Sequence, residues 1–130
     1  MLETTYGVSH PTQLQFADAV ARVKDRLRDH GFGVLCEIDI AKTLKDKIGV
    51  DMEPYVIIGS CNPKFAYEAL LREPGLGLLL PCNVVVAQRD GHVEVAVVDA
   101  RAMLSITGNA SLESVASEVS VLLEAAIKGV

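Results

Sequence analysis

Hydrophobic residues recur along this chain at two periods, and the switch between the periods marks the predicted elements. After residue 15, apolar side chains recur at steps of four, three and four, which is one face of a helix: Phe16, Val20, Val23 and Leu27. We expect this helix to run to about His30 and to stop at Gly31. Residues 33–38 and 54–61 are short apolar runs instead, and these lengths are typical of strands.

The rest of the pattern completes an alternating order of elements. Helices are predicted over residues 40–48 after Asp39, from Pro63 to before Pro74, over 99–106, and from Ser111 onward. Strands are predicted over 4–10, 83–88 and 93–98, giving the order β-α-β-α-β-α-β-β-α-α. Asp90-Gly91 between the last two strands indicates a hairpin, so these two are antiparallel. We therefore predict an α+β fold with a single mixed or antiparallel sheet and helices packed mainly on one face.

Several local signals predict how the elements begin and end. Thr12 to Gln15 has the form of a capping box for the first long helix, and Pro11 should end the first strand. Asn62 followed by Pro63 is typical of a helix start, because Asn caps free N–H groups and Pro suits the first helical position. Residues 75–77 (Gly-Leu-Gly) are interpreted as a linker or an irregular edge.

Composition narrows the classes of protein. A chain of 130 residues fits a single domain, residues 1–130. Half of the residues are hydrophobic and the mean hydropathy is +0.32, so we expect apolar surface to be covered by a homodimer partner. A net charge of −5 without a basic stripe argues against nucleic-acid binding.

The apolar runs and the cysteines indicate where the protein resides. No run approaches the ~20 residues that a membrane-spanning helix needs, so we expect no membrane partner. The first residues lack the basic start and apolar stretch of a signal peptide, so we expect a cytoplasmic protein. The chain has three cysteines that are not densely spaced, which indicates reduced thiols rather than a disulfide framework.

Two copies of a Cys-Asn dipeptide are the strongest candidate for a site. Each lies beside a proline where a strand ends or begins, a position at which binding residues collect. The candidate ligand-binding residues are Cys61, Asn62, Lys64, Cys82 and Asn83. The start of a helix can lower the pKa of a thiol such as Cys61, whereas most free cysteines are simply buried.

Other kinds of site receive less support. Cys36, within an apolar run, is expected in the core. The cysteines and histidines lack the close spacing of zinc sites, so no metal ligands are assigned, and the cofactor is unknown. Residues 59–64 could hold an anion at a helix start, although Pro63 removes one donor. Ser60 lacks the Gly-x-Ser-x-Gly setting of hydrolases, and no catalytic residue is assigned, so whether the chain is an enzyme stays open.

Three strings of residues resemble a known bacterial family, the domain of unknown function 302 family. They are Glu37-Ile38-Asp39-Ile40 with Thr43-Leu44-Lys45, Tyr55-Val56-Ile57-Ile58-Gly59-Ser60-Cys61-Asn62-Pro63-Lys64-Phe65-Ala66, and Gly77-Leu78-Leu79-Leu80-Pro81-Cys82-Asn83-Val84-Val85-Val86. The resemblance spans residues 7–127 and implies a small α+β fold and dimerisation. It supplies no reaction.

Three functions stay open at this point. The first is a dimeric module that binds a small ligand or anion near the two Cys-Asn segments. The second is a thiol-dependent redox or sulfur-handling protein that uses Cys61 or Cys82, and the third is a structural or interaction domain without such a site. The first two require that both segments meet at one accessible place.

Overall fold

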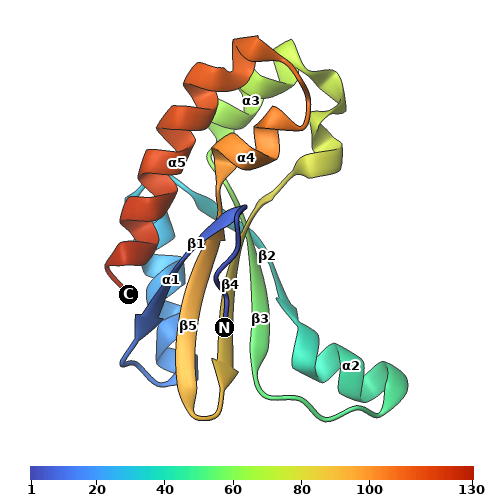
Figure 1. The fold of residues 1–130 in the computed structure, drawn as a ribbon, viewed down its shortest axis with the longest axis vertical. Coiled ribbons are helices and arrows are strands. Elements are labelled where there is room, and N and C mark those ends of the chain that lie inside the picture. Colours follow the sequence, from blue (N-terminus) through green and yellow to red (C-terminus); the bar gives the residue numbers. More distant parts are fainter.

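A single five-stranded antiparallel sheet with helices against one side forms the fold (Figure 1). A computed structural model describes all 130 residues. The strands are β1 (Gly7–Thr12), β2 (Gly33–Asp39), β3 (Tyr55–Cys61), β4 (Cys82–Arg89) and β5 (His92–Val98). The helices are α1 (Phe16–Asp29), α2 (Ile40–Ile48), α3 (Pro63–Arg72), α4 (Ala100–Ser105) and α5 (Glu113–Lys128). The predicted fold class and order of elements are confirmed.

The strands lie in the order β1-β5-β4-β3-β2, and every neighbouring pair is antiparallel. The predicted hairpin joins β4 to β5, where Asp90 and Gly91 take φ of 51° and 79°, as a tight hairpin turn requires. Pro11 does not end the first strand, contrary to the expectation from sequence. It lies inside β1, an edge strand, where its missing N–H donor is tolerated.

The signals at the helix ends were mostly correct. Asp39 caps α2 by accepting the Lys42 N–H at 2.9 Å, and Gly49 ends this helix with a φ of 70°. Asn62 caps α3 by accepting the Phe65 N–H at 3.3 Å. The capping box at Thr12 was wrong, because Thr12 still belongs to β1 and its hydroxyl accepts the N–H of Leu14, two residues on.

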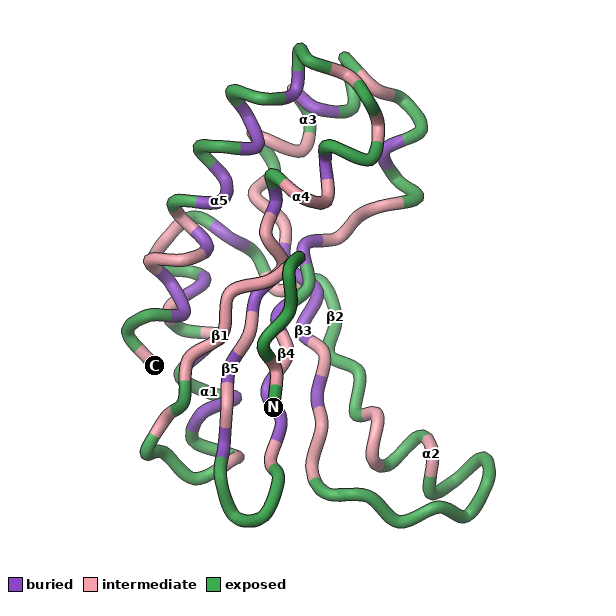
Figure 2. Tube along the Cα trace, in the orientation of Figure 1, coloured by how far each residue is buried: buried purple, intermediate pink, exposed green.

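The core lies between the sheet and the two long helices, α1 and α5. Alternate residues of the central strands point to this side and are fully buried, among them Ile58, Val84, Val86, Val95 and Val97. The helices contribute Val23 and Leu27 from the predicted stripe of α1, and Leu123 from α5. Figure 2 shows the buried positions on the central strands and on the facing sides of α1 and α5. None of the helices is both long and apolar enough to cross a membrane.

Three segments differ from the expectation. The supposed linker belongs to a 3-10 helix over Pro74–Leu79, and Leu76 within it is buried, which anchors the segment. A short 3-10 turn over Ala110–Leu112 precedes α5, so this helix begins at Glu113 rather than Ser111. Cys36 is exposed rather than in the core, because it lies on edge strand β2 and pairs with Gly59 on the face away from α1.

Candidate functional site

An apolar cavity of about 290 Å³, partly open to the surface, lies at the end of the sheet where α3, α4 and α5 gather. Of the 18 residues that line the cavity, 15 are hydrophobic. Its walls come from the end of β3, the start of α3, the segment that leads into β4, and the inner sides of α4 and α5. Residues from both Cys-Asn segments line it, so the fold brings the two segments together.

Cys61 and Asn62 form the part of the wall where β3 passes into α3. Both side chains are partly exposed and both line the cavity. The Asn62 Oδ1 atom is engaged by the Phe65 N–H, as the helix cap predicted from sequence. The Asn62 Nδ2 amide has no hydrogen-bond partner within the chain and lies beside Gly31, where a Cβ atom would approach it to 3.2 Å.

Cys82 lies deeper, at the first position of β4. It pairs across the sheet with Ser60, which is fully buried and donates its hydroxyl to the Cys82 carbonyl oxygen at 2.9 Å. Both residues line the cavity. Because successive side chains of a strand point to opposite faces, Cys82 and Asn83 cannot share the cavity.

Asn83 and Lys64 are the two predicted site residues that lie elsewhere. Asn83 is exposed and lines a different hollow, of about 360 Å³, on the opposite face of the sheet beside Tyr6 and Tyr55. Lys64 is exposed on the first turn of α3 and is not part of the cavity lining. The structure therefore brings together Cys61, Asn62 and Cys82.

Burial governs the electrostatics of the two thiols. Desolvation raises the pKa of Cys61 above its ordinary value. Desolvation, followed by the charge of a neighbouring Cys61 thiolate, raises the pKa of Cys82 to about 11. No lysine or arginine lines the cavity to oppose this effect. Both groups are therefore neutral thiols at pH 7, contrary to the activation that a helix N-terminus could give.

The rest of the lining is apolar and comes from residues that were not among the candidate site residues. Phe65 lies on α3, and Val115 and Val119 lie on α5. Met103 on α4 and Leu76 of the 3-10 helix were not singled out. Periodicity shows that such residues point inward, but the space left between them depends on how three helices meet.

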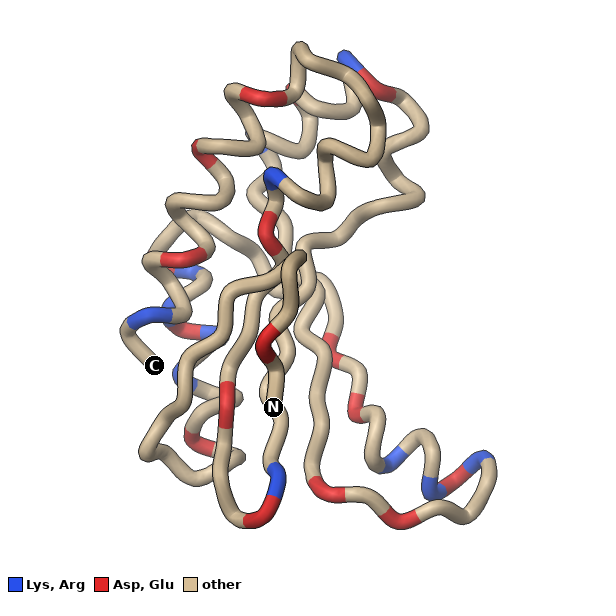
Figure 3. The backbone as a smooth tube through the Cα atoms, in the orientation of Figure 1, with Lys and Arg blue, Asp and Glu red and all other residues tan.

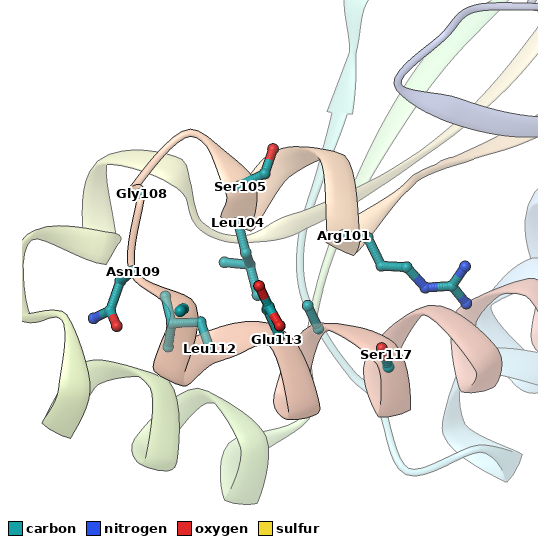
Figure 4. Close-up of a pocket in the computed structure, with 10 residues that line it drawn as sticks. Arg101, Leu104, Ser105, Gly108, Asn109, Leu112, Glu113 and Ser117 are labelled. Atoms are coloured by element: carbon teal, nitrogen blue, oxygen red, sulfur yellow. The ribbon is translucent and has the colours of Figure 1, made fainter.

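A second hollow, of about 400 Å³, lies between α4 and the first turns of α5 (Figure 4). Figure 4 shows Arg101 at one end and the Glu113 carboxylate beside Leu104, and no ion pair joins the two charges. Asn109 is committed to the fold, since its Nδ2 amide donates to the Arg72 carbonyl oxygen at 3.0 Å. Only 4 of the 10 residues that line this hollow are hydrophobic, so the cavity with the two thiols is the better candidate for an apolar ligand.

The chain has no cluster of side chains suited to binding a metal ion. No group of three or more His, Cys, Asp or Glu side chains lies close enough to hold a metal ion. All three cysteines are free thiols. The candidate site is therefore the apolar cavity, whose lining includes two neutral thiols and one amide.

The chain is thus a small α+β domain with one antiparallel sheet and an apolar cavity at one end of that sheet. A family model described as "Domain of unknown function DUF302" matches residues 8–130, and the chain belongs to this family. The structure is similar to the crystal structure of an uncharacterized conserved DUF302 protein from Bacillus stearothermophilus. That similarity has a TM-score of 0.90 and 25% sequence identity, over 96% of this chain and 98% of the other. No curated protein matches the sequence.

Proposed function

We propose that this domain binds a small, mainly apolar ligand in the cavity between the end of β3 and helices α3, α4 and α5. The observation that carries the proposal is the lining itself, in which 15 of 18 residues are hydrophobic around about 290 Å³. Ligand sites are typically concave and apolar, with a few polar groups that fix the ligand's orientation. The volume lies at the lower end of such sites, which suits a compact molecule.

The polar groups of the lining define the ligand further. The free Asn62 Nδ2 amide can donate to one acceptor atom, such as a carbonyl or hydroxyl oxygen. Cys61 adds a polarisable thiol that is partly exposed. We therefore infer an uncharged ligand with an apolar body and one hydrogen-bond acceptor.

An anionic ligand receives less support from the geometry. No Lys or Arg lines the cavity, and Lys64 is exposed outside it. At the start of α3, Pro63 has no N–H and the Phe65 N–H is occupied by Asn62, so few free donors remain for an anion. The charge of an anion would lie uncompensated among apolar side chains.

A thiol-dependent redox or sulfur-handling role also receives less support than the binding of an apolar ligand. A redox or sulfur-transfer role needs a thiolate, and burial raises the pKa of both Cys61 and Cys82. We retain a cytoplasmic location and a homodimer as parts of the proposal. The first is supported by three free thiols and the second by the high apolar content.

Binding of N-phenyl-1-naphthylamine tests the proposal, because this uncharged fluorophore brightens in apolar surroundings. We expect saturable binding of one molecule per chain. Ala66→Trp should weaken it at least about tenfold, because Ala66 lines the cavity and an indole there fills the space. Ala125→Trp is the matched control, since Ala125 is also a partly buried helical alanine and lies outside the lining.

Two results would count against the proposal. One is an unmodified chain that does not bind the fluorophore. The other is equal binding by both tryptophan variants, which would place the fluorophore elsewhere. If Ala66→Trp fails to fold, as circular dichroism would show, Ala66→Leu fills less of the same space and should weaken binding to a smaller degree.

A further inference from the structure

One face of the sheet has no helix packed on it. Ile38, Ile57, Val85 and Ala96 are paired in register across β2, β3, β4 and β5, so they form one apolar row on the side away from α1. The N-terminal segment covers only part of this side, where the Leu2 N–H reaches Glu94 on β5 at 3.3 Å (Figure 1). The end of the row at β2 lies uncovered, and Ile38 is 44% exposed.

The second uncovered apolar surface lies next to this row. Residues 40–52, called the arm here, comprise α2 and the loop after it, and Figure 1 shows α2 projecting from the edge of the sheet. No residue of α2 is buried, and Figure 2 shows only exposed and intermediate positions along it. The exposed apolar side chains of the arm are Ile48 at 66%, Val50 at 45% and Met52 at 40%.

Helix α2 of the arm has one apolar side, as is typical of a helix that packs against another surface. Ile40, Leu44 and Ile48 recur every four residues and so lie along one side of α2. The ion pairs Lys42–Asp46 and Lys45–Asp51 occupy other positions of the arm. A helix of 9 residues has marginal stability in water unless its apolar side is packed. We therefore expect another surface to pack on this side of α2.

The accessible surface area of the chain indicates how much surface a partner would bury. The accessible surface is 7345 Å² for 13.9 kDa. A compact monomer of this mass exposes about 6,700 Å². The excess of about 700 Å² is close to the ~800 Å² that each partner buries in a standard protein interface. One interface with a partner of ordinary size therefore accounts for the excess.

Charge favours a second copy of this chain as that partner. The arm, residues 40–52, contains three lysines and two aspartates, a net charge of +1, whereas the whole chain carries −5. The remaining residues therefore carry −6. Figure 3 shows both basic and acidic positions along the projecting arm, and one acidic position on the N-terminal segment, whose only acidic residue is Glu3. A basic arm is attracted to an acidic copy of the same chain.

We propose that two copies associate by exchanging arms, so that the arm of each copy packs on the open apolar row of the other. A twofold axis satisfies both surfaces at once, because each copy gives an arm and receives one. The contact covers Ile48, Val50 and Met52 from one copy and the row at Ile38 and Ile57 from its partner. None of these residues lines the ligand cavity, so the contact leaves that cavity free.

Molar mass from light scattering, at micromolar concentration, tests this assembly. The unmodified chain should give twice 13.9 kDa. Ile48→Lys should give 13.9 kDa, because a charge on the arm would be buried without a partner. Ile57→Lys should give the same loss from the receiving surface. Ile106→Lys is the matched control, since Ile106 is 72% exposed at the other end of the molecule, and it should remain a dimer.

Several outcomes would overturn the proposal. An unmodified chain that stays monomeric throughout the micromolar range excludes the dimer. A dimer that survives Ile48→Lys excludes the arm, and a dimer that survives Ile57→Lys excludes the open row. Circular dichroism establishes that each variant is folded. If Ile48→Lys does not fold, Met52→Lys, which lies outside the helix, makes the same test of the arm.

Discussion

Pro81 packs directly against the backbone of Gly59: a Cβ atom on Gly59 would lie 2.9 Å from Pro81 Cγ and 2.6 Å from Cys36 Sγ. Both distances are shorter than carbon contacts in folded proteins. The small size of Gly59 thus allows the segment that leads into β4 to lie close on β3. Because Cys82 follows Pro81, this approach also sets where Cys82 meets the cavity.

Gly59→Ala should destabilise the protein by about 1–3 kcal/mol. The added methyl group meets a rigid proline ring, so the strand or the ring has to shift, as in other overpacked sites. Urea denaturation measures the change. Gly77→Ala is the control, because no atom lies within 4 Å of the position that its Cβ would take, and it should change stability by less than about 0.5 kcal/mol. Equal effects of the two substitutions would contradict the close packing.

The cavity thiols should differ in reactivity toward a disulfide reagent. In a Cys36→Ser background, which removes the exposed thiol, we expect Cys61 to react slowly in the native protein and Cys82 only on unfolding. Cys61 is partly exposed, whereas Cys82 is 8% exposed. Absorbance of the released thiolate, with and without urea, counts the thiols. Rapid reaction of both at pH 7 would reopen the redox role.

The stability contribution of Cys82 should fall in alkali. Its folded pKa, about 11, lies above the ordinary 9.0, so the folded state holds the proton more tightly than the unfolded state does. The contribution is therefore complete below pH 9, declines between pH 9 and 11, and is lost above that range. The full loss is about 3 kcal/mol at 1.36 kcal/mol per pKa unit.

Comparison with Cys82→Ala isolates this effect from other groups that titrate in alkali. The difference in free energy of unfolding between the unmodified chain and Cys82→Ala should shrink from pH 8 to pH 11. Val84→Ala serves as the control: Val84 is also buried on β4 but does not ionise, so its difference should stay constant. A constant difference for Cys82→Ala as well would show that the thiol is not desolvated.

The fold could be predicted from the sequence wherever local chemistry determines it. Asp39 and Gly49 bound α2, and Asn62 with Pro63 starts α3, because capping depends on residues a few positions apart. Thr12 shows the limit of such signals. It has the spacing of a capping box, but strand pairing with Val93 on β5 holds it in the sheet. Tertiary pairing outweighed the local preference there.

The candidate site could be predicted only in part, for a geometric reason. Cys61 and Cys82 do meet, as neighbouring strands allow, and this depended on β3 pairing with β4. The repeated dipeptide suggested that Cys82 and Asn83 act together, whereas alternation along β4 sends them to opposite faces. Cys36 has an apolar setting, yet its strand is at the edge and its side has no helix. Which face is covered depends on the assembled helices.

Arg26 joins α1 to the end of α5, and its loss should destabilise the protein by about 1.5–3 kcal/mol. Its Nε and Nη2 atoms donate to the carbonyl oxygens of Ala126 and Ala125 at 2.9 and 2.7 Å, where the last turn of α5 has no internal donors. Arg26→Met keeps the aliphatic length and removes both bonds. Urea denaturation should therefore show a lower midpoint.

Arg28→Met is the control for Arg26, because Arg28 lies in the same last turn of α1 and pairs only with exposed Asp25. Exposed pairs at this spacing contribute little, so we expect a change below about 0.5 kcal/mol. The comparison also separates the two contacts from the favourable interaction of any cation with the end of α1, which both arginines make. If Arg28→Met destabilised the protein as much as Arg26→Met, the loss would come from that helix end, and the link from Arg26 to α5 would contribute nothing.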